Sequence, residues 1–293
     1  MEVTLKGVEQ FELKWFLVAV LDLLGQKDKL RGLRIPETQE EHGQMIDILK
    51  ETWGAVDALR EFVLELVREG SARSDPPKTM PPEQAETWRR LRSFDIRYFV
   101  VSDSVFIWVP LDGSGQAGAV YHTLVALAGT ELAFLSLGYP LRGGVAVGLA
   151  SDSVPPTIYG PALNEAVRLE SRVAKHPRVV CGRSIENYLQ HLSQRQGDSL
   201  DARFESLMAT ACRGLVVTDS DGELILDYLG SEARGVLNDA EGSGVLDMGR
   251  KVHEFFQSQI AEWNKKGCKK LVERYTAASR YVDSRLGPDR VRP

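Results

Sequence analysis

Two acidic residues stand where a carboxylate can do chemistry. Asp22 ends an apolar run, and Gly25 follows it closely. Asp103 separates two short runs rich in β-branched and aromatic residues, 98–101 and 104–107. Runs of this kind indicate strands, so the acids can converge where a buried strand ends beside a tight turn. Each acid alone also fits a plainer role, as a helix N-cap or a turn residue.

Convergence of the two acids predicts a cation site. Two carboxylates held close together repel each other unless a cation lies between them. Oxygen ligands with no Cys or His nearby favour Mg²⁺ or Mn²⁺ over Zn²⁺. Ions of this class usually act on phosphates, so the pair indicates a phosphate-bearing substrate.

A third segment carries groups that suit a nucleotide. Residues 143–148 indicate a glycine-bearing buried strand, and the pattern becomes helical from Pro161. Asn164 and Arg168 are four residues apart, so they share one helix face. An amide and a guanidinium on that face can both donate hydrogen bonds to a nucleotide, and arginine suits the charge that develops on phosphate during transfer.

Taken in order, these parts resemble the class III nucleotidyl cyclases, the adenylyl and guanylyl cyclase family. The order is a strand ending in Asp-hydrophobic-x-Gly, a hairpin with a second Asp, a glycine-bearing strand, and a helix with Gly-x-x-x-Asn-x-Ala-x-Arg-Leu-Glu-Ser at 160–171. Within the family, the chain is most similar to the bacterial pyrimidine cyclases of the Pycsar anti-phage system. That narrower resemblance rests on the segments 21–25, 102–104, 160–171, 177–180 and 221–229.

The resemblance implies an α/β (α+β) fold, the ferredoxin-like palm of class III cyclases, in which helices flank a central, mostly antiparallel sheet. Residues 1–198 would form the catalytic domain, and residues 199–293 a family-specific α/β extension packed on its core. A Pro-rich inserted loop is expected at 70–87. An exposed loop tolerates such an insertion, so the two acids can still pair.

The resemblance also assigns metal and phosphate ligands. Asp22, Asp103 and the carbonyl of Leu23 would hold two divalent cations per site, Mn²⁺ or else Mg²⁺. The tight turn at Gly25 and the amides from Gln26 onward would hold the triphosphate, as amides at a helix start do.

The helix residues complete the expected site. Asn164 would orient the ribose, and Arg168 would stabilise charge on the transferring phosphoryl group. In the resembled family the metal acids and the Asn/Arg pair face one site from opposite protomers. The chain carries both halves, so the resemblance implies a homodimer with two composite active sites.

Two further positions bear on the choice of base. In the purine cyclases these lie four residues before the second metal Asp and seven before the catalytic Asn, which are Phe99 and Thr157 here. Neither the adenine pair, Lys with Asp, nor the guanine pair, Glu with Cys, is present. An aromatic wall at Phe99 favours a pyrimidine, although Phe99 also fits the plainer role of filling the core of its strand. The hydroxyl of Thr157 can serve uracil or cytosine.

These expectations describe an enzyme that converts UTP or CTP, with UTP favoured, to the 3′,5′-cyclic monophosphate and pyrophosphate. The resemblance implies a second messenger of anti-phage defence and a separate effector that responds to it. The alternatives are a catalytically silent nucleotide-binding or regulatory module, a purine cyclase, and a metal-dependent polymerase or diguanylate cyclase palm. The last is disfavoured because the chain has no Gly-Gly-Asp/Glu-Glu-Phe signature.

The composition of the chain limits which partners and which cellular compartment we expect. The chain has 293 residues, 43% hydrophobic and 26% charged, which is ordinary for a globular protein. A net charge of −5 argues against general nucleic-acid binding. The three cysteines suggest neither a disulfide framework nor a metal site, and the apolar run 15–24 is too short to span a bilayer. We expect a cytoplasmic protein with no nucleic-acid or membrane partner.

The remaining pattern supplies the elements that must position these residues. Apolar steps of three and four residues predict helices at 37–69 (one, or two with a break near Gly54), 119–137, 161–175, 182–195 and 248–282 with a break at Gly267. Alternating or continuous apolar runs predict strands at 15–21, 97–109 (a hairpin), 141–149, 156–160, 178–181, 214–218 and 224–229.

Overall fold

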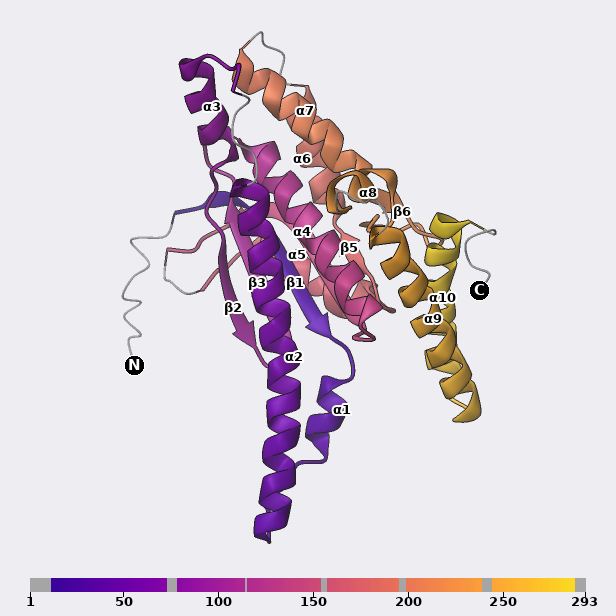
Figure 1. Ribbon diagram of the computed structural model, residues 1–293. Helices are drawn as coiled ribbons and strands as arrows, with labels where there is room; N and C mark the ends of the chain where they lie inside the picture. The colour runs from indigo at the N-terminus through magenta and orange to yellow at the C-terminus, as the bar shows by residue number, and fades with distance from the viewer. Residues whose placement is uncertain are drawn as a thin grey trace, which may run out of the picture.

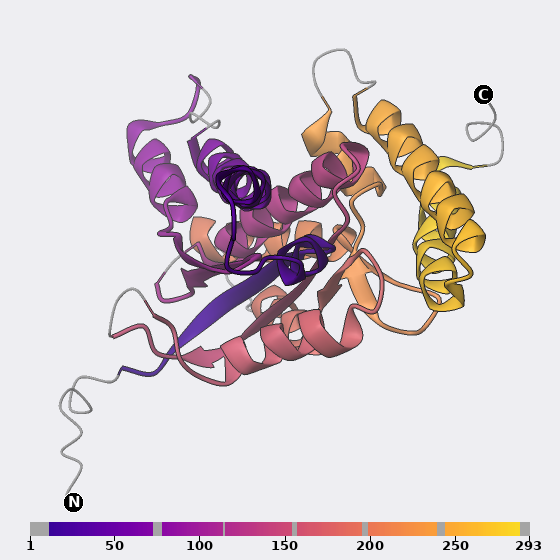
Figure 2. The same ribbon diagram turned by 90° about the horizontal axis from the view of Figure 1, so that it is seen from below.

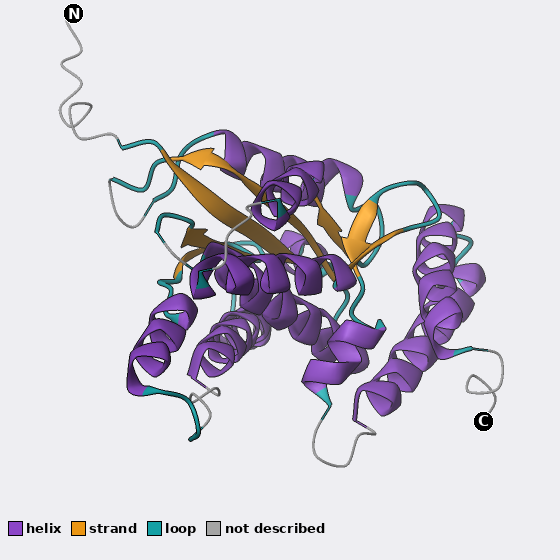
Figure 3. Cartoon of the chain, turned by 90° about the horizontal axis from the view of Figure 1, so that it is seen from above, coloured by secondary structure: helices purple, strands orange, loops and turns teal. Residues whose placement is uncertain are grey.

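The computed structural model describes residues 12–72, 78–113, 115–153, 157–194, 199–238 and 244–287. Within them, strands form one seven-stranded sheet in the order β2-β3-β1-β4-β5-β7-β6, and helices cover both faces (Figure 1 and Figure 3). The strands are β1 (Lys14–Leu23), β2 (Arg97–Val101), β3 (Ser104–Pro110), β4 (Leu141–Ala150), β5 (Val179–Cys181), β6 (Val216–Thr218) and β7 (Leu224–Leu226).

The helices lie between and after these strands in the sequence. They are α1 (Gln26–Arg31), α2 (Gln39–Ala72), α3 (Pro82–Arg92), α4 (Gln116–Ser136), α5 (Pro161–Arg168), the π-helical turn η2 (Leu169–Val173), α6 (Arg183–Ser193), α7 (Leu200–Gly214), α8 (Ser231–Leu237), α9 (Gly244–Lys265) and α10 (Lys269–Leu286). Among the described strand pairs, only β4 and β5 run parallel. The predicted α/β architecture, a mostly antiparallel sheet flanked by helices, is confirmed.

The first four strands follow a β-α-β-β-α-β order along the chain. β1 leads through α2 to the β2–β3 hairpin, and α4 leads to β4. β1 lies between β3 and β4 and is antiparallel to both. In this split arrangement the end of β1, the turn of the hairpin and the start of β4 lie side by side at the same end of their strands.

β1 is covered on both faces, which explains its unbroken apolar sequence. Its odd-numbered residues 17–23 pack in one core with residues of α2, α4 and α6. Its even-numbered residues 16–20 pack in a second core with residues of α5. Figure 2 shows α5 on one side of the strands and α2 and α4 on the other.

The segment between β1 and β2 agrees with one of the two predicted helix alternatives and differs from the predicted loop. α2 is a single helix without a break at Gly54, and Figure 1 shows it projecting beyond the sheet with α1 beside it. The loop predicted at 70–87 is too long at both ends, because α2 continues to Ala72 and α3 begins at Pro82. Proline suits a first helical position, where its missing N–H has no partner to lose. Residues 73–77 lie outside the described part of the chain.

The chain after residue 199 extends the sheet and adds helices to it. β7 pairs with β5 through Val180 and Ile225, so the predicted β6–β7 hairpin becomes the outer edge of the sheet. α9 and α10 pack against each other, with α9 also against α4. The predicted break between them is confirmed at Gly267, which has a φ of 69°.

One described helix, α4, has the length and apolar character of a membrane span, with a mean hydropathy of 1.3. Most of that stretch, 89%, is buried inside the protein. A core helix of a globular domain has the same composition because it is covered on all sides.

Candidate functional site

Asp22 lies in a row of polar residues that crosses the sheet near the end of β1. Its partners in register are Ser104 on β3 and Arg142 on β4. The Ser104 hydroxyl donates to Asp22 Oδ1 at 2.9 Å, and the Arg142 guanidinium pairs with Asp22 Oδ2 at 2.9 Å. Directly opposite residues on neighbouring strands share a face, so Asp22, Ser104 and Arg142 lie on the sheet face that α5 covers. Together with Asp103, described next, they are called the acid row.

Asp103 lies beside Asp22, at the two-residue turn between β2 and β3. The backbone N–H of Leu23 donates to the carbonyl of Asp103 at 3.2 Å. Both acids are only 3% exposed. Ser102, which precedes Asp103, has a φ of 56°, a conformation that non-glycine residues rarely adopt. The structure therefore brings together the two acids and Leu23, as the strand-and-turn pattern predicted.

Arg142 lies between two acids that are far apart in the sequence. Besides its contact with Asp22, its Nε lies 2.7 Å from Glu170 Oε1 on η2. Sequence reasoning did not select Arg142 or Glu170. The available signal was a basic residue opening a buried strand, together with the Glu inside the motif at 160–171. The site that was predicted to hold a metal cation thus already contains a guanidinium.

The turn after β1 has the predicted form. Gly25 has a φ of 91°, in the left-handed region that favours glycine, and α1 begins at the next residue. The N–H of Leu24 donates to the carbonyl of Pro140 at 2.9 Å, which fixes the turn beside the start of β4. Gln26 is buried, and its Oε1 accepts no hydrogen bond from the described residues.

An aromatic surface lies next to the acid row on the same face. Phe99 pairs in register with Phe106, and their rings stack with centroids 4.5 Å apart and an interplanar angle of 7°. Trp108 meets the Phe99 ring edge-on at 5.7 Å. Phe106 is opposite Val20, two residues before Asp22 on β1. Because two residues span about 7 Å along a strand, a ring stacked here would lie close to the acids.

Phe99 takes a position between its two predicted roles. It is half-buried and packs against the core, yet part of its ring faces solvent. Thr157 is exposed in the segment that leads from β4 to α5. The strand predicted at 156–160 is wrong for the described residues 157–160, which form only an isolated bridge between Tyr159 and Ser151. Asp152 was not among the predicted site residues. It accepts a hydrogen bond from Trp108 Nε1 at 3.3 Å and forms an ion pair with Arg97 of β2. That residue links the β4–α5 segment to the aromatic surface.

Asn164 and Arg168 lie on the exposed side of α5. The Asn164 side chain makes no hydrogen bond with the described residues, whereas Arg168 donates to both carboxylate oxygens of Glu165, at 2.7 and 2.8 Å. Neither is bonded to Asp22 or Asp103. Within one chain, the two halves of the predicted site therefore do not meet.

The oxygen donors at the acid row fit a hard divalent cation. Asp22 and Asp103 supply carboxylates, and the carbonyl of Leu23 is a third oxygen nearby; Mg²⁺ and Mn²⁺ sites typically use few protein oxygens and keep several waters. No group of three or more His, Cys, Asp or Glu in the described ranges is placed to hold a metal ion. A cation here would thus depend on two carboxylates and on substrate oxygens.

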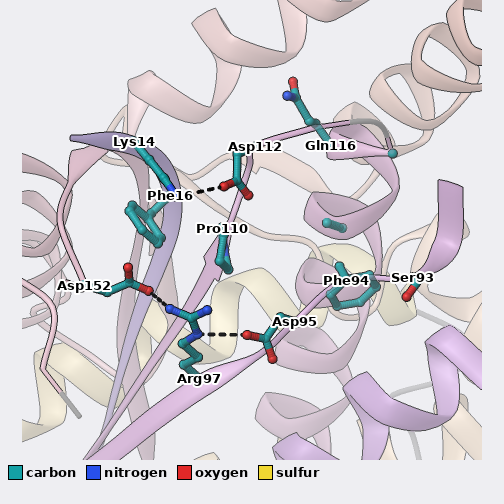
Figure 4. A pocket seen from close by; sticks show the side chains of 12 residues that line it. Lys14, Phe16, Ser93, Phe94, Asp95, Arg97, Pro110, Asp112, Gln116 and Asp152 are labelled. Carbon is teal, nitrogen blue, oxygen red and sulfur yellow. Dashed lines mark hydrogen bonds and ion pairs between the residues drawn. The ribbon is translucent and has the colours of Figure 1, made fainter. Parts of the chain in front are cut away.

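A pocket of about 230 Å³ lies at the opposite end of β1 from Asp22. Figure 4 shows its charged lining, in which Lys14 pairs with Asp112, and Arg97 pairs with Asp95 and Asp152. Both basic groups are therefore neutralised within the protein. The pocket contains neither acid of the acid row, and the chemistry predicted from the sequence does not map to it.

Comparison of the chain with protein families, with curated proteins and with solved structures found no match. The functional argument therefore rests on three features: the acid row, the aromatic surface and the exposed face of α5.

Proposed function

We propose that the chain is a metal-dependent cyclase that converts a pyrimidine ribonucleoside triphosphate to its 3′,5′-cyclic monophosphate and pyrophosphate. The observation that carries the proposal is the placement of two buried acids, Asp22 at the end of β1 and Asp103 in the adjoining β2–β3 turn, next to an aromatic surface. The β-α-β-β-α-β order of the first four strands agrees with the ferredoxin-like palm of class III cyclases.

The cation ligands in this proposal are the carboxylates of Asp22 and Asp103 and the carbonyl of Leu23. Two ions, Mn²⁺ or Mg²⁺, would when bound lower the pKa of the ribose 3′-hydroxyl and neutralise charge on the triphosphate. The left-handed turn at Gly25 starts α1 directly after β1, and the amides from Gln26 onward would donate hydrogen bonds to the triphosphate.

The α5 residues act on the sugar and the transferring phosphoryl group. Asn164 would orient the ribose so that its 3′-oxygen attacks the α-phosphorus in line with the departing pyrophosphate. Arg168 would stabilise the charge that develops on the equatorial oxygens, for which a planar guanidinium is well suited. Both side chains are exposed and directed away from the core of their own chain, which supports a role in a site shared with a second copy.

The aromatic surface is the proposed base site. The stacked pair of Phe99 and Phe106 offers a flat face next to the acid row and narrows the space available to a base. A smaller pyrimidine suits that space, and Thr157 can bond either pyrimidine edge. We favour UTP over CTP. The same proposal includes a cytoplasmic enzyme and a separate effector that responds to the cyclic product.

A second candidate is a nucleotide-binding or regulatory module without catalysis. The observation that favours it is the ion pair between Arg142 and Asp22, since a resident guanidinium already compensates the acid that a metal would need. The two candidates differ in whether added metal ions compete successfully with that side chain.

The deciding experiment is incubation of the purified chain with Mn²⁺ and each of the four ribonucleoside triphosphates, with products identified by mass spectrometry. We expect cyclic UMP or cyclic CMP, and loss of the product in Asp103→Asn. Formation of cyclic AMP or cyclic GMP would agree with the proposed mechanism but contradict the role of Phe99 in selecting a pyrimidine. Tight nucleotide binding without turnover in any of the four reactions would support the regulatory module instead.

A further inference from the structure

A second cavity lies on the other face of the sheet. Its volume is about 500 Å³, within the range of small-molecule sites. It forms where the start of β1 and the second half of β4 meet α6. Trp15, which lines it, and Asp22 are seven residues apart on β1, roughly 23 Å at strand spacing, and they point to opposite faces.

Two aromatic rings form one wall of this cavity. Trp15 is 47% exposed, unusually open for so large an apolar side chain, and its ring centroid lies 5.8 Å from that of Tyr188. The Tyr188 hydroxyl donates to Gln116 Oε1 at 2.9 Å, and Gln116 Nε2 donates to the carbonyl of Gly113 at 2.9 Å. These bonds hold Tyr188 in place, so the wall is preorganised for a flat ring.

Polar groups on one face of α6 form the second wall. Ser184, Asn187, Tyr188 and His191 follow a spacing of three, four and seven residues, which places them on a single helix face. The Ser184 hydroxyl accepts a hydrogen bond from the backbone of β4. In contrast, the side chains of Asn187 and His191 form no hydrogen bond with any described residue. An amide and an imidazole are thus available at the edge of the aromatic wall.

The charge of the lining limits the ligand. No Asp, Glu, Lys or Arg lines the cavity in the described residues, so no permanently charged side chain there compensates a phosphate, a carboxylate or an ammonium group. Exposure of this face of α6 to solvent would by itself explain why the side chains of Asn187 and His191 form no hydrogen bond. It would explain neither the exposed ring of Trp15 nor the hydrogen bonds that fix Tyr188.

We propose that this cavity binds a small, uncharged, planar heteroaromatic molecule. Its ring stacks on Trp15 and Tyr188, and its polar edge is hydrogen-bonded by Asn187 and His191. The cavity shares no residue with the acid row or with the aromatic surface at Phe99. The inference therefore goes beyond the proposed cyclase function and stands or falls separately from it.

The test is saturation-transfer NMR with adenosine as the probe, on the full chain in EDTA, with affinities from titration. We expect saturation transfer to the base protons in the wild type. Binding should be at least about fivefold weaker in Trp15→Ala, since stacking on one aromatic ring contributes this much. It should also be weaker in Asn187→Leu, which loses a hydrogen bond to the polar edge of the ligand. Trp15→Phe keeps an aromatic face and should keep most of the affinity. Trp53→Ala is the matched control, because Trp53 is also exposed but lies on α2 outside the cavity.

Several outcomes would overturn the proposal. These are no transfer to adenosine in the wild type, equal affinity in Trp15→Ala and Trp53→Ala, or loss of binding in Phe99→Ala rather than in Trp15→Ala. Much tighter binding of AMP than of adenosine would contradict an uncharged ligand. A change of oligomeric state in Trp15→Ala, measured by light scattering and unaffected by adenosine, would show that a second copy covers the cavity.

Discussion

Glu131 is an acid in the interior of the fold, and it belongs to neither of the two proposed sites. It lies in the middle of α4, is 0% exposed, and neither carboxyl oxygen has a hydrogen-bond partner among the described residues. Burial raises its pKa well above the ordinary value, although the nearby backbone N–H of Val179 and the charge of Arg178 oppose the shift. Burial therefore favours the protonated form of Glu131 in the folded chain.

Replacing Glu131 should change how stability depends on pH. Unfolding releases its proton at any pH above about 4.3, so the stability that this proton contributes is complete below that value and falls as pH rises toward the folded pKa. Each pH unit in that window costs about 1.4 kcal/mol. Urea unfolding from pH 5 to 8 should show a smaller loss of stability in Glu131→Gln. The surface control Glu86→Gln should follow the wild type, and parallel curves for all three proteins would contradict this account.

A second prediction at the scale of single residues concerns Arg142. Its guanidinium neutralises the largely buried Asp22 and Glu170 in the metal-free chain, so Arg142→Gln should lower stability by on the order of 3 kcal/mol. The two uncompensated acids should then attract a divalent cation more strongly. We expect Mn²⁺ to raise the melting temperature more in this variant than in the wild type.

The control for Arg142 is Arg97→Gln, which removes an arginine whose ion pairs with Asp95 and Asp152 lie away from the acid row. Its response to Mn²⁺ should equal that of the wild type. Equal Mn²⁺ shifts in Arg142→Gln and the wild type would show that Asp22 does not bind the cation.

At the scale of elements, the close approach of α5 and η2 to β4 depends on Gly144. A Cβ there would lie 2.3 Å from the carbonyl oxygen of Ala166 and 2.6 Å from the backbone nitrogen of Glu170. Since both are backbone atoms, the helix would have to move. This helix carries the Asn/Arg pair, so its position relative to the sheet matters for the proposed site.

Gly144→Ala should therefore destabilise the fold by roughly 1–3 kcal/mol, as overpacking typically does, and lower any cyclase activity further than the loss of folded protein explains. Gly148→Ala is the matched control on the same strand, because its Cβ would meet Ala162 at an ordinary 3.4 Å. Chemical denaturation and activity per folded molecule measure both effects. Equal stability of the two variants would mean that α5 can shift without cost.

At the scale of the whole molecule, the separation of Asn164 and Arg168 from the acids predicts complementation between chains. Asp22→Ala and Arg168→Ala should each be inactive alone. A random mixture should regain about one quarter of the wild-type activity, because half of the dimers are mixed and each mixed dimer has one intact site of two. Activity after mixing and re-equilibration measures this directly.

The control mixture is Asp22→Ala with Asp103→Ala. Both changes fall on the same half of the site, so no mixed dimer has an intact site, and no activity should return. Activity in Arg168→Ala alone, or its absence in the first mixture despite formation of mixed dimers, would argue against composite sites.

Much of the fold could be predicted because its signals are local. The apolar run before Asp22, the turn at Asp103 and the glycine at Gly267 each act within a few residues, through burial, turn geometry and backbone freedom. The start of α3 at Pro82 was also a local signal, and the cluster of prolines around it obscured it. Convergence of Asp22 and Asp103 followed from strand ends alone.

What the sequence by itself determined was the set of elements and the residue types at their ends. Only the tertiary structure decided that Arg142 lies between Asp22 and Glu170, and that Trp15 and Tyr188 share a cavity wall. Such pairings depend on strand register and on how a helix docks across the sheet, which many weak contacts between distant segments set together. No local pattern contains that information, because the partners become neighbours only after the chain has folded.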